Sequence, residues 1–387
     1  MACSDTALIQ AINDSNANLN DHILDLTTYC LYTLTDADGQ LPTITQPLVI
    51  HGHNATIRRD PGATTNFRIF EVGGVSLTMD TLTVMNGNAM GVGNGGAVDL
   101  ETNFGSLTTT DVNFQGNASD SGGAIFAGAR TSLSLTRGLV NDNRTDGGGG
   151  GIGVIGLVPV FLDTVTVTGN RADMGGGAIL DSTQLSTIMN STFSHNTAVE
   201  GGGGIFSASS GTLAVTGTKI ADNRVAASTD GGGGIFREAI SGGSATFTNS
   251  TISGNTVTGF RTADGSSNRG GAIHAIAGPI TLDNTQVAGN RLIGPFGQGA
   301  GIAAAGDVVT TTLTLQNGTT LTRNLASGRY SQGGGLYTDS STSGVTVSVT
   351  GSHIDANKVT GTGSVSGGIY NSGGTVSLTN SSVNNNV

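Results

Sequence analysis

Short apolar runs separated by glycine, asparagine and aspartate form the pattern of this chain. From residue 48 onward the runs are three to five residues long, as at residues 48–50, 55–57 and 76–79, and turn residues flank each of them. Runs of this length between turn residues predict β-strands and exclude helices. We therefore expect an all-β structure over most of the chain.

A glycine-rich marker recurs within this pattern. Three small residues, mostly glycine, precede an aliphatic residue ten times, and the aliphatic residues are Val98, Ile125, Ile152, Ile179, Ile205, Ile235, Ile273, Ile302, Leu336 and Ile369. They are spaced 27, 27, 27 and 26 residues apart, then 30, 38, 29, 34 and 33. One turn of three short strands and three corners needs about 20 to 30 residues, so each repeat predicts one turn of a parallel β-helix.

A second marker alternates with the first. It is an asparagine three positions after an aliphatic or aromatic residue, and it occurs at Asn117, Asn143, Asn170, Asn196, Asn223, Asn255, Asn290, Asn324, Asn357 and Asn386. Equivalent residues on adjacent turns lie about 4.8 Å apart. The asparagines are therefore predicted to form a structural amide ladder. The expected fold is a right-handed, single-stranded parallel β-helix (β-solenoid) over residues 41–387, with about a dozen turns.

Residues 1–40 are predicted to form an N-terminal cap. Ser4 can cap a helix over residues 4–16, in which Leu8, Ile9 and Ile12 make one apolar stripe. A helix laid over the end of a solenoid hides its first open sheet edge. The only cysteines, Cys3 and Cys30, both lie in this segment, and a disulfide between them is favoured over two buried thiols.

The two markers together resemble the GGAI and FxxN repeats of the polymorphic outer-membrane proteins and of other bacterial surface proteins with right-handed parallel β-helix repeats. The closest matches are Phe114-Gln115-Gly116-Asn117 with Gly122-Gly123-Ala124-Ile125, and the equivalent residues from Phe193 to Ile205. The resemblance covers residues 95–387. It implies a β-helical passenger or stalk displayed outside the cell, often adhesive, although this chain lacks the family's C-terminal membrane barrel.

Composition narrows the expected partners and location. The net charge of −11 and the pI of about 4.7 argue against nucleic acid and anionic membranes as partners. No apolar stretch is long enough for a membrane helix, and the first residues do not form a signal peptide. With the disulfide, these features favour an extracellular or cell-surface protein whose export signal has been removed.

Candidate ligand-binding residues lie just after the asparagine marker. The basic residues at that position are Arg144, Arg171, Arg224, Arg291 and Lys358. Stacked on nearby turns, they would hold an acidic glycan or a receptor carboxylate on another cell. The alternative is structural: their stems cover the corner while their heads pair with Asp146, Asp173 or Asp230.

Insertions in the later repeats mark the same side of the helix. The longer arcs are residues 257–269, 292–298, 325–332 and 359–366. Solenoid insertions gather on one face, often the binding face, although neutral elaboration of an exposed corner explains them equally well. The candidate ligand residues within these arcs are Arg261, Asp264, Arg269, Arg329 and Tyr330.

An enzyme is the alternative function, and it would be a polysaccharide lyase or glycoside hydrolase. Glycoside cleavage needs carboxylates about 5 to 10 Å apart. No acidic residues are predicted to stack on adjacent turns in strand positions, and Asp99, Glu101 and Asp181 are the most plausible exceptions. No catalytic residue is therefore assigned.

No cofactor or metal site is predicted either. His51 and His53 lie beside a Gly-Asn turn without a further histidine or cysteine in the repeat frame, which argues against a metal. The function favoured by the sequence is a non-enzymatic extracellular scaffold: an adhesin passenger, a stalk or a filament subunit. Self-association is expected through the open C-terminal sheet edge.

Overall fold

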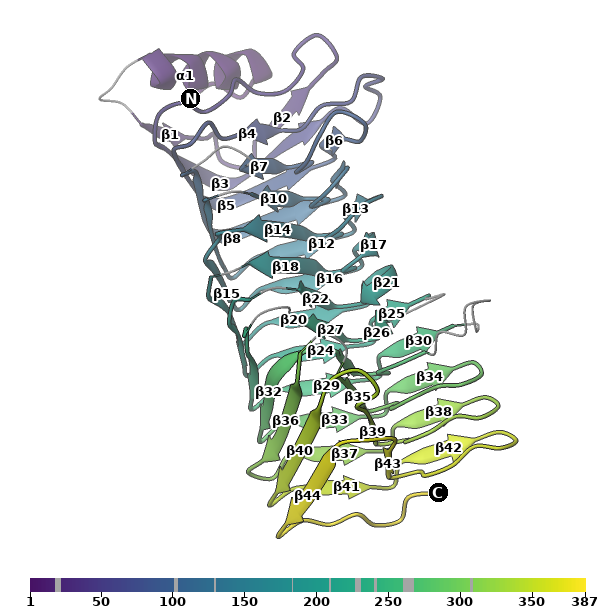
Figure 1. Cartoon of the computed structure of the whole chain (residues 1–387). Coiled ribbons are helices and arrows are strands. Elements are labelled where there is room, and N and C mark those ends of the chain that lie inside the picture. Colours follow the sequence, from purple (N-terminus) through teal and green to yellow (C-terminus); the bar gives the residue numbers. More distant parts are fainter. Residues whose placement is uncertain are drawn as a thin grey trace. The chain divides into compact units, whose positions relative to one another are not determined.

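A computed structural model describes residues 1–17, 22–100, 104–128, 130–182, 184–208, 210–226, 231–239, 242–259, 268–306 and 309–387. The chain forms two compact units, of which the first is Met1–Asp173 with Gly177–Ile179, and the second is Met174–Gly176 with Leu180–Val387. Each unit is a parallel β-solenoid, in which short strands pair with the equivalent strand one turn on (Figure 1). The predicted all-β solenoid with a short N-terminal helix is confirmed.

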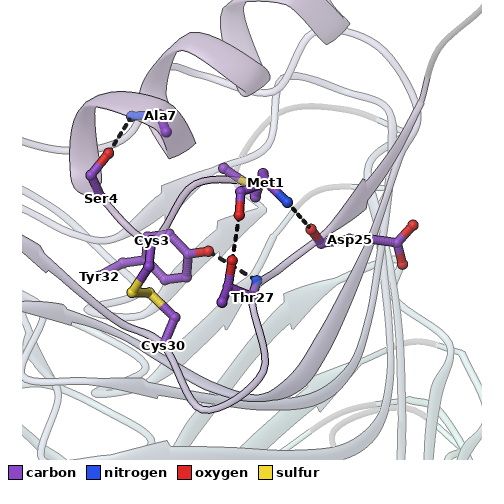
Figure 2. Close-up of a disulfide and its surroundings, with 8 residues drawn as sticks. All are labelled: Met1, Cys3, Ser4, Ala7, Asp25, Thr27, Cys30 and Tyr32. Atoms are coloured by element: carbon purple, nitrogen blue, oxygen red, sulfur yellow. Dashed lines mark hydrogen bonds between the residues drawn. A yellow bond between two sulfur atoms is a disulfide. The ribbon is translucent and has the colours of Figure 1, made fainter.

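Helix α1 spans Asp5–Ala17, so it begins one residue later than predicted. Ser4 caps it, because the Ala7 N–H donates to the Ser4 Oγ at 3.2 Å. Leu8 and Ile12 are fully buried. A disulfide joins Cys3 to Cys30, and Figure 2 shows that it ties the segment just before α1 to the turn that precedes β2. The predicted disulfide is confirmed.

Three sheets run along the first unit. The first sheet contains β1 (Ile23–Asp25), β2 (Leu31–Leu34), β3 (Leu48–Arg59), β5 (Ser76–Met85), β8 (Ser106–Gln115), β11 (Ser132–Thr136), β12 (Leu139–Asn141), β15 (Val160–Asp163) and β16 (Thr166–Thr168). The second contains β4 (Phe70–Glu71), β7 (Val98–Leu100), β10 (Ile125–Ala127) and β14 (Ile152–Gly156). The third contains β6 (Asn88–Ala89), β9 (Ala118–Ser119), β13 (Arg144–Thr145) and β17 (Arg171–Met174), of which Met174 belongs to the second unit. Strands β1 and β2 pair with β3, so residues 1–40 contribute strands to the solenoid as well as the helix.

The second unit repeats the same three sheets. Its first sheet contains β19 (Ser186–Met189), β20 (Thr192–Ser194), β23 (Leu213–Thr216), β24 (Lys219–Ala221), β28 (Ala245–Thr248), β29 (Thr251–Ser253), β32 (Gly278–Asp283), β33 (Gln286–Ala288), β36 (Thr311–Gln316), β37 (Thr320–Thr322), β40 (Val345–Thr350), β41 (His353–Asp355) and β44 (Thr375–Thr379). The second contains β22 (Ile205–Ala208), β27 (Ile235–Glu238), β31 (Ile273–Ala275), β35 (Ile302–Ala305), β39 (Leu336–Asp339) and β43 (Ile369–Asn371). The third contains β21 (Thr197–Gly202), β25 (Arg224–Val225), β26 (Gly231–Gly232), β30 (Thr256–Thr258), β34 (Arg291–Ile293), β38 (Leu325–Ser327) and β42 (Lys358–Thr360), and β18 (Ala178–Ser182) has residues in both units.

The glycine marker comes at the start of the strands of the second sheet from β7 onward. Its aliphatic residues pair in register, as Ile125 with Ile152 in the first unit and Ile273 with Ile302 in the second. All four side chains are fully buried and fill the core of their turns. Gly122 shows why glycine precedes them: its φ is +62°, and a Cβ there would lie 2.2 Å from the Ile125 carbonyl oxygen. One repeat therefore makes one turn, as predicted.

The asparagine marker forms a buried ladder in each unit. The ladder residues are Asn117, Asn143 and Asn170 in the first unit, and Asn196, Asn223, Asn255, Asn290, Asn324, Asn357 and Asn386 in the second. The backbone N–H and the Nδ2–H of Asn117 both donate to the Asn143 Oδ1, at 2.8 and 3.0 Å. The same pair of hydrogen bonds recurs along the ladder. The predicted ladder is confirmed.

Candidate functional site

The corner after the ladder is formed by the third sheet, and its side chains alternate between core and solvent. In the first unit the outward positions pair in register as Asn88 with Ala118, Ala118 with Arg144, and Arg144 with Arg171. Arg144 and Arg171 are exposed. Within the described ranges, no ion pair involves either guanidinium, nor Asp146 or Asp173, and Asp230 lies outside them. The two arginines therefore lie one turn apart with their charges unneutralised.

A cavity of about 360 Å³ opens beside Arg144. We call it the corner cavity, and its lining residues are Arg59, Pro61, Asn86, Gly87, Asn88, Gly116, Ala118, Asp142 and Arg144. It exists because one turn carries two small residues, Gly116 and Ala118, at the outward positions where the next turn has Asp142 and Arg144. With turns about 4.8 Å apart, the backbones of the two turns that flank this notch are about 10 Å apart.

Arg59 lines the corner cavity from the end of β3. Its side chain is 7% exposed, and its guanidinium donates to the Ala63 carbonyl oxygen at 2.6 Å and to the Thr65 carbonyl oxygen at 2.7 Å. The guanidinium also lies over the Phe67 ring, 5.3 Å from its centroid. Arg59 is therefore held rigidly and contributes a fixed positive charge.

The two walls carry different polar groups. Asn88 is held on one wall, where its Nδ2–H donates to the Asn66 Oδ1 at 2.8 Å. On the opposite wall, the Asp142 Oδ2 accepts a hydrogen bond from Asn141 at 2.7 Å. Arg144 lines the same wall. Its guanidinium N–H groups donate to no acceptor among the described residues. The cavity thus offers amide, carboxylate and guanidinium groups to a polar ligand.

Sequence reasoning identified Arg144 and missed the rest of the corner cavity. Gly87 holds the ladder position one turn before Asn117, and its N–H donates to the Asn117 Oδ1 at 3.0 Å. Because glycine replaces the marker asparagine there, the repeat pattern did not align Asn86 and Asn88 with the later turns. The clue in the sequence was the two asparagines that flank this glycine.

The other basic residues of the corner lie in the second unit and do not stack directly. Arg224 pairs in register with Thr256, which pairs with Arg291. Arg291 pairs with Leu325, which pairs with Lys358. Arg224, Arg291 and Lys358 are exposed, but a neutral residue separates each from the next. These cations therefore lie two turns apart, which spaces them more widely than Arg144 and Arg171.

The candidate residues of the long arcs have mixed surroundings. Arg269 is engaged: its Nε–H donates to the Gln298 Oε1 at 2.9 Å, and its Nη2 lies 3.0 Å from the Asp339 Oδ2. The Tyr330 ring stacks on Phe296 with 5.3 Å between centroids, and the Arg329 guanidinium lies over the same ring. The stacking of Tyr330 on Phe296 links two neighbouring loops. Arg261 and Asp264 lie outside the described residues.

Two acidic residues do stack on adjacent turns, so the expectation that none would is wrong. Glu71 in β4 pairs in register with Asp99 in β7. The Arg68 Nη1 lies 3.0 Å from the Asp99 Oδ2 and 3.7 Å from the Glu71 Oε2. Asp99 is 2% exposed. The early turns precede the first clear glycine marker, and their register was therefore not apparent from the repeat.

Of the other acidic exceptions, Asp181 lies at a partly buried position in β18, and burial raises the pKa of its carboxyl group. Glu101 lies outside the described residues.

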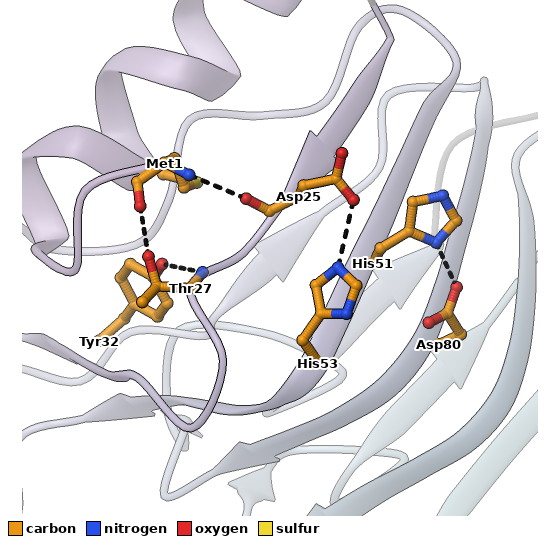
Figure 3. A network of polar contacts seen from close by, with 7 residues as sticks. All are labelled: Met1, Asp25, Thr27, Tyr32, His51, His53 and Asp80. Atoms are coloured by element: carbon orange, nitrogen blue, oxygen red, sulfur yellow. Dashed lines mark hydrogen bonds and ion pairs between the residues drawn. The ribbon is translucent and has the colours of Figure 1, made fainter.

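His51 and His53 are each bound to a carboxylate. The His51 Nδ1 lies 2.6 Å from the Asp80 Oδ2, and the His53 Nε2 lies 3.2 Å from the Asp25 Oδ1. Figure 3 shows the two imidazoles turned toward different acids. Among the described residues, no three histidine, cysteine, aspartate or glutamate side chains converge as metal ligands.

Comparison with known families agrees with this architecture. The family model described as "Right handed beta helix region" matches residues 96–270. The comparisons with curated proteins and with solved structures gave no match. The chain is thus a β-helix repeat protein. No described helix is long and apolar enough to cross a membrane.

Proposed function

We propose that the chain is a non-enzymatic extracellular scaffold, such as an adhesin passenger or a stalk, that presents its arginine-bearing corner to a surface glycan or a receptor on another cell. One observation carries the proposal: Arg144 and Arg171 lie in register on adjacent turns, both exposed and without an ion pair among the described residues, and Arg144 lines the corner cavity. In a protein of net charge −11, such a local concentration of free positive charge favours a specific anionic partner.

An extracellular location is part of the proposal. The Cys3–Cys30 disulfide supports it, because disulfides persist in oxidising compartments and are rare in the cytosol. The regular turns also suit a scaffold, since each turn buries its aliphatic and asparagine side chains and leaves the outward positions free to vary.

The alternative is a polysaccharide lyase or glycoside hydrolase. The stacked Glu71 and Asp99 favour it, because a carboxylate pair is what glycoside hydrolysis requires. The burial of Asp99 and its ion pair with Arg68 weigh against it, since a catalytic carboxylate must reach the sugar. The scaffold fits these contacts better.

A screen of acidic and neutral polysaccharides separates the two functions. Wild-type protein and a Glu71→Gln variant are incubated with each polymer, and new reducing ends and unsaturated products are measured. The scaffold proposal expects no product from either protein. Product from the wild type that the Glu71→Gln variant fails to release would replace the scaffold with a hydrolase.

Self-association belongs to the same proposal. Residues 359–387 contain no charged residue, and Leu378 and Val383 are 46% and 40% exposed in the last turn. Natural sheet edges are usually protected by charge or proline, so an edge without them is prone to pair with a second copy of the chain. Light scattering should show mass rising with concentration for the 387-residue chain and not for a Leu378→Lys variant. A constant monomer mass for the unmodified chain would contradict the proposed self-association.

A further inference from the structure

The shape of the corner cavity limits its ligand to a small, thin group. Its volume of about 360 Å³ lies at the lower end of the range for small-molecule sites. The notch is one turn wide, with Gly116 and Ala118 at its base, and the backbones of the two flanking turns are about 10 Å apart. A single sugar ring of a longer chain suits this space.

The lining groups match a sugar with its hydroxyl groups. Asn86 and Asn88 on one wall provide amide donors and acceptors, and the Asp142 carboxylate on the other wall accepts from hydroxyl groups. Pro61 adds an apolar surface for the C–H groups of the ring. Hydroxyl groups of one ring can therefore bind both walls.

The charge balance points to an anionic sugar. Arg59 and Arg144 outnumber Asp142 within the cavity, and Arg171 lies one turn beyond Arg144. Arg59 is already bound to backbone carbonyl oxygens, whereas the Arg144 donors are free among the described contacts. A planar carboxylate accepts two parallel hydrogen bonds from a guanidinium, which makes arginine the natural partner for it.

We infer that the corner cavity binds a carboxylate-bearing sugar of an extracellular glycan, with Arg144 as the ligand of the carboxylate and Asn88 and Asp142 as ligands of the hydroxyl groups. Arg171 then binds the carboxylate of the next acidic sugar along the glycan. The inference rests on the proposed scaffold function and adds the chemical class of its ligand.

The test is calorimetric titration with an oligosaccharide of glucuronic acid. The comparison ligands are its carboxyl-reduced, neutral counterpart, a sulfated glucan and an acidic peptide. Arg144→Ala removes the proposed carboxylate ligand from an exposed position, and Arg224→Ala is the matched control at the equivalent position of another turn. Ala118→Gln fills the notch and leaves the charge unchanged. The next turn carries Arg144 at the position that pairs in register with Ala118, so a long side chain is compatible with the fold.

We expect Arg144→Ala to weaken binding of the acidic oligosaccharide by about tenfold or more, the value of a hydrogen bond to a charged group. Ala118→Gln should abolish binding, and Arg224→Ala should leave it unchanged. The neutral oligosaccharide, the sulfated glucan and the peptide should all bind more weakly than the glucuronic acid oligosaccharide.

Equal losses for Arg144→Ala and Arg224→Ala would overturn the inference, because they would indicate diffuse charge attraction. Absence of binding by the wild type, equal binding of the neutral oligosaccharide, or preference for the sulfated glucan or the peptide would also overturn it. None of these results alone would refute the scaffold, which fails instead if the polysaccharide screen yields cleavage products.

Discussion

Asn223 donates both its backbone N–H and its Nδ2–H to the Oδ1 of Asn255, each at 3.0 Å. Its own Oδ1 accepts the same two hydrogen bonds from Asn196. Asn223 therefore links its turn to both neighbouring turns through a side chain that is 1% exposed. Stability should depend on these amides more than on any exposed polar residue.

Replacing Asn223 by alanine should destabilise the protein by about 3 to 5 kcal/mol, because it removes the buried acceptor of two Asn196 hydrogen bonds and the donors to the Asn255 Oδ1 and the Phe193 carbonyl oxygen. Chemical denaturation measures the change. Asn113→Ala, at an exposed position of β8, is the control and should change stability by less than about 0.5 kcal/mol. Similar losses for the two variants would contradict the role of the ladder.

Gly122 should be intolerant of a side chain for a steric reason that goes beyond its φ. A Cβ there would lie 2.2 Å from the Ile125 carbonyl oxygen, whereas Gly289 has a similar φ of +65° and open space around it. Gly289→Ala should cost about 1 to 2 kcal/mol from its left-handed backbone alone. Gly122→Ala should cost clearly more in thermal unfolding, and an equal cost would refute the close approach at the corner.

The Cys3–Cys30 disulfide should stabilise the cap. The sequence separation is 27 residues, for which loop closure predicts about 3 to 4 kcal/mol. A Cys3→Ala, Cys30→Ala double variant should expose residues 1–40 to limited proteolysis earlier than the rest of the chain. Unchanged proteolysis of the cap would show that the packing of Leu8 and Ile12 is sufficient without the disulfide.

Acidification should destabilise the second unit through His274. Its side chain is fully buried without a hydrogen-bond partner, and burial, followed by the charge of Arg269, lowers its pKa well below 6.5. The unfolded chain binds a proton below about pH 6.5 and the folded chain does not, so stability falls as the pH decreases, by about 1.4 kcal/mol per pH unit.

His274→Phe should reduce this acid loss. The phenylalanine ring would pack against Phe236, which already contacts His274 with 5.2 Å between ring centroids and stacks on Phe206. Denaturation midpoints between pH 7 and pH 5 should therefore decline less for the variant than for the wild type. Parallel declines would mean that other groups cause the acid sensitivity.

The interior of the turns could be predicted from the sequence, and the corner cavity could not. Ile125 and Ile152 repeat at one spacing because every turn must bury the same position, and the ladder asparagines repeat for the same reason. Arg144 and Arg171 were found because each follows a ladder asparagine directly. These predictions used only the period of the repeat and the position of each residue relative to the ladder asparagine.

The positions of the other residues of the corner cavity depend on the pairing register of turns that lack the markers. Gly87 replaces the ladder asparagine, so Asn88 had no marker to align it with Ala118 and Arg144. The cavity also depends on the small size of Gly116 and Ala118 on one turn, which matters only once the neighbouring turns are placed around it. The sequence singled out Asp99 but not its pairing with Glu71, because β4 also lies in a turn without the markers.

The central claim is that each repeat makes one turn and so brings Arg144 and Arg171 together. Spin labels at Arg144→Cys and Arg171→Cys test it, because both sites are exposed and the described native cysteines are joined in a disulfide. With backbones about 4.8 Å apart, the doubly labelled protein should give an electron paramagnetic resonance spectrum with strong dipolar broadening. A spectrum equal to the sum of the two singly labelled proteins would contradict the register and the site built on it.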